Sequence, residues 1–341
     1  MGRDKRNKYT IDLHQQAYNK LTSMQAFGQS KKEAVANGTD RDKIFSFSTY
    51  QTYWKHTKYF IKWVQANHPE CTTLKAAKKH VNTWLQERVD QGLSAWTVQT
   101  EAKALGKLYG IQPDDPDYFQ PPKRIRADIK RSRGDRVRDK HFSKTNNADL
   151  IKFCQGTGLR KAELSTLKGS DLVGRSVLQA EFDQLQSLPK RTGEQERYMG
   201  VLKGALAFKQ DYFVHVRPGK GKGGRERFSP IIGPDTNEIV GRMREVGPDN
   251  LVFVKINSNA DIHSYRSDYA ARVYREYARP IDQIPFDRTN KGTGKKFQGD
   301  VYVCRKDEAK KKLDKAAMKM CSKALGHNRV EVVATNYSHK L

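Results

Sequence analysis

The sequence predicts a mainly α-helical protein with a small β-sheet, built from a helical N-terminal domain and a mixed α/β C-terminal domain. The length of 341 residues exceeds what one hydrophobic core usually supports and favours two domains. Apolar side chains recur at helical spacing through residues 45–110. Between residues 212 and 232, apolar and polar residues instead alternate around a segment rich in Gly and Lys, which predicts a β-hairpin.

These patterns divide the chain into four parts. Residues 1–44 are predicted to form a basic N-terminal arm around one helix, and residues 45–112 a helical domain. Residues 113–145 are predicted to be a linker, because the Pro-rich start PDDPDYFQPP cannot be helical throughout and a dense run of Arg and Lys follows it. Residues 146–341 form the mixed domain. The helix of the arm is predicted from the spacing of Leu13, Ala17, Leu21 and Met24, ending at Gly28.

Three helices are predicted in residues 45–112. A capping pair at Ser48 and Gln51 indicates the start of the first. The second lies near residues 74–91, and the third is capped by Ser94 and ends at Gly110. The inner face of the first helix carries the aromatic and apolar residues Tyr50, Tyr53, Trp54, Phe60, Trp63 and Val64.

The mixed domain is predicted to begin with a helix at residues 147–155. Helical patterns return at residues 263–278 and 308–325. Residues 173–210 are interpreted as an enlarged loop or an extra helix, to which the sequence gives no clear role.

The charge balance indicates a polyanionic partner. The chain has 64 Lys and Arg against 38 Asp and Glu, a net charge of +26. Nucleic acid is the favoured partner, and an ordinary basic protein, ribosomal or at a membrane surface, is the alternative. A mean hydropathy of −0.84 and the lack of a long apolar run exclude a transmembrane span. With no apolar signal segment at the N-terminus, we expect a cytoplasmic, nucleoid-associated protein without a membrane partner.

The cysteines predict neither a disulfide framework nor a zinc site. Cys71, Cys154, Cys304 and Cys321 lie far apart, and the sequence contains no CxxC pair. Cys154 and Cys321 stand among apolar residues and are expected to be small core side chains.

Three short segments and one turn carry residues suited to phosphodiester chemistry. The segments are GTGLRKAEL (156–164), HSYR (263–266) and LGHNRVEVVATNY (325–337), and the turn is RPGKGKGGRER (217–227). Together they supply two arginines, a lysine, two histidines and a late tyrosine. Such a set offers a nucleophile, cations for a phosphorane and a proton for the leaving oxygen, without metal or nucleotide.

In their order along the chain and in their short sequence motifs, these segments resemble the tyrosine recombinase (phage integrase) family, over roughly residues 45–341. The resemblance implies a helical core-binding domain followed by a catalytic domain that together clamp double-stranded DNA at specific sites. It implies an integrase or excisionase of a mobile element that works as a homotetramer on DNA. Cleavage would give a 3′-phosphotyrosyl intermediate, exchange would pass through a Holliday junction, and no cofactor would be needed. Accessory DNA-bending or directionality proteins are candidate partners.

The resemblance also assigns roles to residues. Arg160 and Arg266 would clamp the phosphate, because a guanidinium keeps its charge and donates two hydrogen bonds. Glu163, one turn after Arg160, would support the site. His263 shares a helix face with Arg266 and would serve as general acid and base. His327 would hydrogen-bond a phosphate oxygen.

Tyr337 would be the nucleophile, and its phenol, with an ordinary pKa of ~10, must lose a proton during attack. Lys222 matches the hairpin lysine that protonates the leaving 5′ oxygen in the family, with Lys220 as the alternative. The interval from His327 to Tyr337 is one residue longer than the commonest family spacing, which puts the delivery of Tyr337 in question.

Further basic residues are expected to contact the DNA backbone, and these are Lys220, Arg225, Arg124 and Arg131. Two other functions remain open on the sequence. A type IB topoisomerase shares the chemistry, and a non-catalytic basic DNA-binding protein would use the same residues only as phosphate contacts.

Overall fold

The computed structural model describes residues 12–125, 142–219, 225–284, 299–304, 310–327 and 329–341. The chain forms two compact units, Met1–Asp128 and Ile129–Leu341. The described residues are mainly helical, with two small antiparallel sheets in the second unit, so the predicted fold class is confirmed. The four-part division at residues 44, 112 and 145 stays a prediction. Among the described residues, no helix combines the length and apolar character needed to cross a bilayer.

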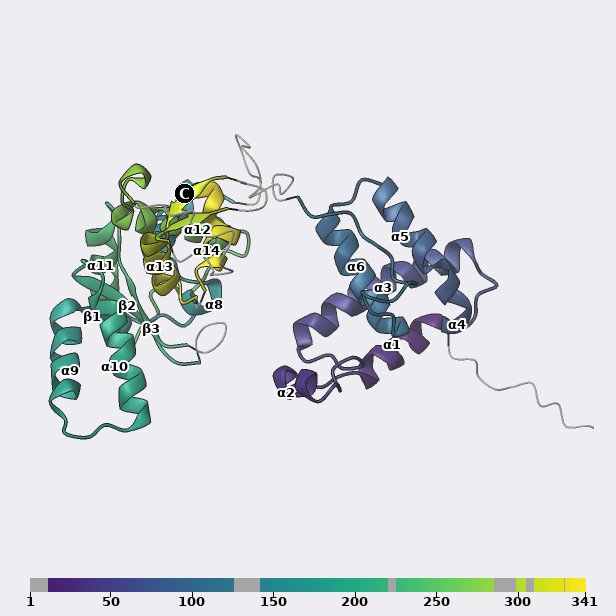
Figure 1. The fold of residues 1–341 in the computed structure, drawn as a ribbon, viewed down its shortest axis with the longest axis horizontal. Coiled ribbons are helices and arrows are strands. Elements are labelled where there is room, and N and C mark those ends of the chain that lie inside the picture. The colour runs from purple at the N-terminus through teal and green to yellow at the C-terminus, as the bar shows by residue number, and fades with distance from the viewer. Residues whose placement is uncertain (1–11, 126–141, 220–224, 285–298, 305–309, 328) are drawn as a thin grey trace, which may run out of the picture. The chain divides into compact units, whose positions relative to one another are not determined.

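Among the described residues of the first unit, the regular secondary structure is helical, with one isolated β-bridge (Figure 1). Its helices are α1 (Leu13–Ser23), α2 (Lys31–Ala36), α3 (Phe47–Asn67), α4 (Leu74–Ala77), α5 (Val81–Asp90) and α6 (Ala95–Tyr109). The longest, α3, packs along α6 and also against α1. Leu21 of α1, Phe60 of α3 and Leu105 of α6 are all fully buried in the shared core. The helix predicted in the N-terminal arm therefore packs into the helical unit.

Local capping explains where these helices begin and end. Ser94 accepts a hydrogen bond from the Thr97 amide, and Gly110 ends α6 in the left-handed conformation at φ 71°, as the sequence predicted. The prediction for α3 was wrong, because Ser46 rather than Ser48 caps it, with the Thr49 amide 3.2 Å from its hydroxyl. The two serines lie two positions apart, and the Gln three residues after Ser48 favoured the wrong one, whereas the extended backbone of Ser46 makes it the cap.

The predicted helix at residues 74–91 is interrupted. A 3-10 turn, η1 (Lys78–His80), separates α4 from α5. Apolar spacing could not reveal this turn, because side chains three apart share a face in both kinds of helix. The interruption places His80 at the junction with α5.

The second unit contains a three-stranded antiparallel sheet of β1 (Leu172–Gly174), β2 (Tyr212–Val216) and β3 (Arg227–Pro230). The predicted hairpin is confirmed as β2 and β3, with Val214 opposite Ser229. A second sheet pairs β4 (Val301–Val303) with β5 (Lys312–Asp314). The helices are α7 (Ala148–Thr157), α8 (Lys161–Leu164), α9 (Arg175–Ser187), α10 (Gly193–Leu206), α11 (Thr236–Glu245), α12 (Ile262–Tyr277), α13 (Lys315–Ala324) and α14 (Glu331–Tyr337).

One prediction for this unit is borne out in its helical alternative and extended, and one needs correction. Residues 173–210 contain most of β1 and two packed helices, α9 and α10, with Leu178 and Leu202 fully buried (Figure 1). The helix predicted at 308–325 starts only at Lys315. Residues 312–314 form β5, and the Asp314 carboxylate then caps α13 by accepting from the Ala316 amide at 2.8 Å. The pairing of β5 with β4 leaves no trace in local apolar spacing.

Candidate functional site

A glycine turn after α7 positions the first arginine of the site. Gly158 has φ 61°, a left-handed conformation that favours glycine. A Cβ atom there would also lie 2.1 Å from the Tyr269 ring, so both the backbone and the packing exclude a side chain. Arg160 follows with an extended backbone and directly precedes α8. The carbonyl of Gly158 accepts a hydrogen bond from Nη1 of Arg266. The turn thus brings the backbone of one segment to the guanidinium of another.

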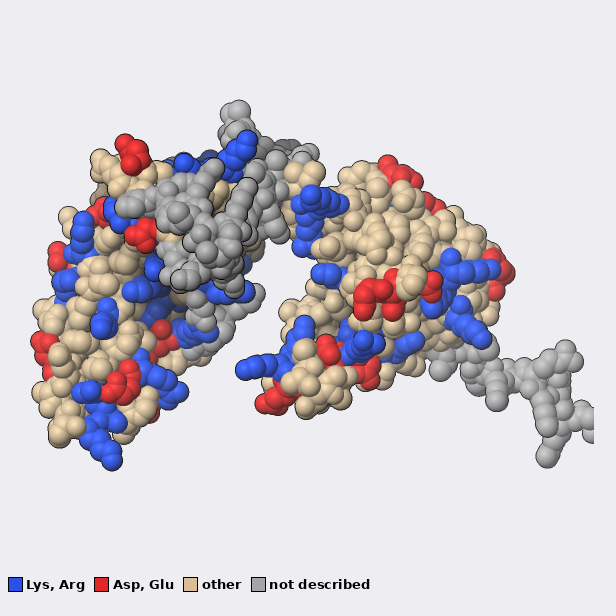
Figure 2. Space-filling model, in the orientation of Figure 1, with Lys and Arg blue, Asp and Glu red and all other residues tan. Residues whose placement is uncertain are grey.

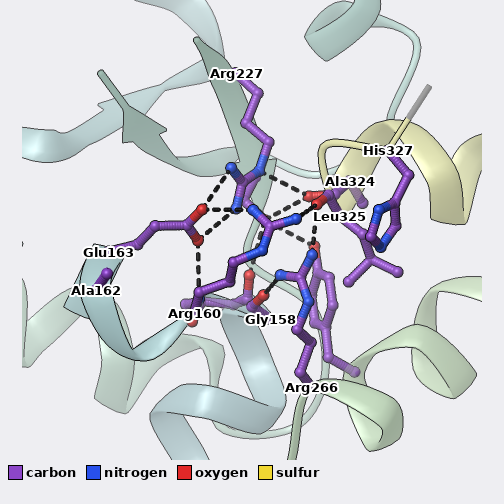
Figure 3. A network of polar contacts seen from close by, with 12 residues as sticks. Gly158, Arg160, Ala162, Glu163, Arg227, Arg266, Ala324, Leu325 and His327 are labelled. Carbon is purple, nitrogen blue, oxygen red and sulfur yellow. Dashed lines mark hydrogen bonds and ion pairs between the residues drawn. The ribbon is translucent and has the colours of Figure 1, made fainter. Parts of the chain in front are cut away.

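Glu163 holds two arginines (Figure 3). Its carboxylate accepts from Nη1 of Arg160 at 2.7 Å and from Nη2 of Arg227 at 2.7 Å, and its side chain is only 2% exposed. The Arg160 amide adds a third contact at 2.8 Å. Burial opposes ionisation of Glu163, but the hydrogen bonds and charges of Arg227 and Arg160 outweigh it and lower the pKa to about 2. Glu163 is therefore a fixed anion.

The C-terminus of α13 gathers all three guanidinium groups. The Ala324 carbonyl accepts from Nε of Arg227 at 3.2 Å. The Leu325 carbonyl accepts from Arg160 at 3.3 Å and from Arg266 at 2.5 Å. The last carbonyls of a helix lack partners within it and carry the negative end of its dipole, so they suit cations.

Gly326 ends this helix at φ 67°. A Cβ atom there would lie 2.9 Å from Cδ of Arg227. The glycine of the LGH segment thus serves both the helix end and the close approach of an arginine.

Arg266 lies at the centre of the cluster and is 3% exposed. Its Nε donates to the hydroxyl oxygen of Tyr337 at 3.2 Å, in addition to its contacts with Gly158 and Leu325. Burial lowers its pKa to about 10; the Tyr337 hydroxyl opposes this lowering, and Arg160 and Arg227 add to it. A guanidinium whose charge is disfavoured by its surroundings would be stabilised by an added anion.

Tyr337 ends α14 with its side chain 2% exposed, and its hydroxyl meets two nitrogens. One is Nε of Arg266, and the other is Nε2 of His327 at 3.3 Å. Burial, followed by the charges of Arg266, Arg160 and Arg227, lowers the pKa of His327 to about 4. His327 is therefore a neutral imidazole at physiological pH.

The other predicted site residues are less central. His263 lies in the first turn of α12, exposed, with its ring centre 6.2 Å from that of Tyr337. Arg225 is exposed just before β3. Arg124, in the first unit, lies over the Trp96 ring at 5.5 Å. Lys220, Lys222 and Arg131 lie outside the described residues. The structure thus brings together Arg160, Glu163, Arg266, His327 and Tyr337, with His263 at their margin.

Arg227 belongs to this cluster and was missed in the sequence. It is 7% exposed, lies at the start of β3 and contacts Glu163 and the end of α13. Its one sequence signal is that it directly precedes the mostly apolar segment 228–232, which distinguishes it from the exposed Arg225 two residues earlier.

The charges of this centre determine what it can bind. The cluster contains one carboxylate and three guanidinium groups, so it keeps a net positive charge next to the Tyr337 hydroxyl. Planar guanidinium groups donate paired hydrogen bonds to the oxygens of phosphates and carboxylates. The arrangement therefore suits an oxyanion placed next to a phenol oxygen.

Comparisons with known proteins give a distant likeness. No protein-family model matches the chain, and no curated protein matches it. A solved structure described as the crystal structure of XerA recombinase aligns over 94% of this chain and 93% of its own. The TM-score is 0.26 and the identity is 14%, so the geometry of the site itself is what bears on function.

Proposed function

We propose that this protein is a site-specific DNA recombinase of the tyrosine class, acting as integrase or excisionase of a mobile element. The observation that carries the proposal is the hydrogen bond from Nε of Arg266 to the Tyr337 hydroxyl, inside a centre with three guanidinium groups. A phenol in a fully packed core has no need of cations, whereas a phenol that attacks a phosphodiester needs them on both reactants.

The proposed reaction is a transesterification. The Tyr337 oxygen attacks phosphorus, the bond to the 5′ oxygen breaks, and a 3′-phosphotyrosyl ester forms while the DNA keeps a free 5′-hydroxyl. The phenol proton passes to a base, and the leaving oxygen takes a proton from Lys222. Arg160 and Arg266 neutralise the non-bridging oxygens of the phosphorane. The reverse reaction with a second 5′-hydroxyl reseals the strand through a Holliday junction.

The two histidines would divide the remaining work. His327 is neutral, and with its proton on Nε2 it would donate to the phenol oxygen alongside Arg266, which stabilises the developing phenolate. The same N–H can turn to a phosphate oxygen once DNA is bound. His263 stands exposed beside the Tyr337 ring and would accept the phenol proton.

DNA binding would have to uncover the nucleophile. Tyr337 is 2% exposed, and Val333 of the same helix is fully buried. We propose that the scissile phosphate reaches the site as α14 shifts, so that the phosphate takes over some of the hydrogen bonds that Arg266 and His327 now make to the phenol.

Affinity for DNA would come from the rest of the surface. The net charge is +26, and on the face shown in Figure 2 both units present Lys and Arg side chains. Arg124 and Arg225 are proposed as contacts to the DNA backbone, which supply affinity without sequence specificity. Assembly into a tetramer on two paired sites, and the help of accessory proteins, are part of the same proposal.

Trapping the covalent intermediate tests the proposal. A nicked duplex spanning a junction of the element that encodes the protein loses a short fragment on cleavage, so the phosphotyrosyl ester cannot be resealed. We expect wild-type protein to become linked to the 3′ phosphate, and Tyr337→Phe to bind the duplex within a few-fold without linkage. An adduct that persists in Tyr337→Phe would move the nucleophile elsewhere.

The cleavage rates of arginine variants in the same assay test the phosphate clamp. Arg160→Ala and Arg266→Ala should each lower the cleavage rate by about 100-fold or more, as loss of one transition-state donor does. Cleavage by both variants within threefold of wild type would contradict the clamp.

The choice of lysine has its own test. A 5′-bridging phosphorothiolate releases a thiolate that needs no proton, so it should rescue Lys222→Ala. Rescue of Lys220→Ala instead would transfer the role to Lys220.

Two alternatives are separated by the substrate. A type IB topoisomerase would relax any supercoiled plasmid as a monomer, whereas the recombinase should act only on its own sites. A non-catalytic DNA-binding protein would form no adduct with the nicked duplex.

A further inference from the structure

The first unit holds a cluster of metal-binding side chains that the DNA chemistry does not use. His68, Glu70 and His80 each place one ligand atom within 4.8 Å of the other two. Nδ1 of His68 lies 3.6 Å from Oε1 of Glu70. Two ligands of one tetrahedral zinc ion, each at about 2.0–2.1 Å from the metal, stand about 3.3 Å apart. The spacing is close to that of a metal site, but the ring planes of His68 and His80 lie only 14° from parallel. Both rings must therefore rotate before a nitrogen of each can point to one ion.

Backbone contacts fix the elements that carry these ligands. His68 is the C-cap residue of α3. The Cys71 amide donates to the His68 carbonyl at 2.9 Å, and this hydrogen bond closes the turn that contains Glu70. Cys71 is 4% exposed and anchors the turn in the core. Gln16 of α1 holds the next stretch by donating to the Thr72 carbonyl at 2.9 Å.

An unpartnered nitrogen points independently to a ligand. Nε2 of His80 is buried, and the structure gives it no hydrogen-bond partner among the described residues. A buried polar atom without a partner is costly, and a metal ion is one way to satisfy an imidazole nitrogen. The ring of His80 stacks on that of His68 with 3.6 Å between centres, and Trp63 packs its edge against His68 at 5.2 Å. The two histidine rings therefore stack face to face beside Trp63, and ligation of one ion by both would open this stack.

We propose that His68, Glu70 and His80 form a structural site for one divalent zinc ion. Two imidazoles and one carboxylate are a ligand set that suits zinc, with water as the fourth ligand, because Glu70 is 64% exposed and the site opens to solvent. The ion ties the C-terminal end of α3 to the junction of η1 and α5. The cysteine spacing could not indicate this site, because its ligands are a glutamate and two histidines that lie twelve positions apart.

The test uses the untagged full-length protein after chelator treatment, with Zn²⁺ alone as the probe in isothermal titration. We expect one saturable ion per chain. Zinc at a hundredfold excess over its Kd should also raise the midpoint of the thermal transition of the first unit by about 5 °C or more. Glu70→Gln and His80→Gln should each weaken binding at least about tenfold. Glu70 is exposed, so its variant cannot fail through lost packing.

The matched control is His14→Gln. His14 is also exposed and also contacts a tryptophan edge, with 4.7 Å between its ring and that of Trp54. It should bind zinc as wild type does. Absence of saturable binding, or equal affinity in wild type and both ligand variants, would overturn the site. With Co²⁺ in place of zinc, a thiolate charge-transfer band would contradict the proposed nitrogen and oxygen ligands.

Discussion

Glu163→Gln isolates the electrostatic role of the buried carboxylate. The amide keeps the shape of the side chain but removes the negative charge that lies 2.7 Å from both Arg160 and Arg227. Leaving buried charges without their partner costs about 3–5 kcal/mol. The lowering of the Glu163 pKa from 4.5 to about 2 corresponds independently to about 3 kcal/mol. We therefore expect the second unit to lose about 3 kcal/mol of unfolding free energy.

Thermal unfolding measures this loss. For a unit of this size, about 3 kcal/mol lowers the melting midpoint by roughly 6–12 °C. The matched control is Glu238→Gln, which breaks an ion pair with Lys152 of nearly equal length, 2.8 Å, at a carboxylate that is 63% exposed. An exposed pair contributes less than about 1 kcal/mol. Equal losses in the two variants would refute the view that burial and two arginines make Glu163 special.

Three other predictions concern Arg227, His327 and the residues after Tyr337. Arg227→Lys keeps a positive charge but cannot span both oxygens of Glu163, so cleavage at saturating DNA should fall about tenfold or more while binding stays within a few-fold; an unchanged rate would contradict a positioning role. The pKa of His327 is about 4 when folded against about 6.5 when unfolded, so its stability contribution is complete above pH 6.5. About 3 kcal/mol of unfolding free energy should be lost as pH falls from 6.5 to 4, as measured by denaturant titration at each pH. His327→Gln should flatten this dependence, and a pH curve identical to that of wild type would contradict the role given to His327. Deleting residues 339–341 should leave recombination nearly intact, because the described contacts of Lys340 are exposed or partly exposed and stay within the chain: an ion pair with Asp268 at 3.0 Å and a hydrogen bond from Arg275 to its carbonyl at 3.2 Å. Loss of synapsis would show that the tail joins subunits.

Helices with strong local signals could be predicted from sequence. Ser94 and Gly110 mark both ends of α6, and both act through contacts within a few residues of themselves. The short strands could not be predicted, because β1 and β4 each have three residues and gain their partners from residues such as Val214 and Asp314, which are distant in the chain. Local pattern therefore located most helices and missed structure created by long-range pairing.

The candidate site shows the same limit. Arg160, Arg266 and Tyr337 could be named because each lies in a recognisable segment, and the structure places their polar groups around the Leu325 carbonyl and the phenol oxygen. Arg227 could not be singled out among its basic neighbours, because its burial depends on Glu163, which lies 64 positions away. The sequence also gave His263 and His327 comparable weight, whereas only His327 meets the Tyr337 hydroxyl.

The central claim is that Tyr337 becomes joined to DNA, and the measurement that tests it most directly is mass spectrometry of the trapped complex. After nuclease and protease digestion, we predict that the peptide containing residues 331–337 carries the residual nucleotide phosphate on Tyr337. A nucleotide on Tyr265 or Tyr269 of α12, or no modified peptide from a protein that still binds its site, would contradict the account.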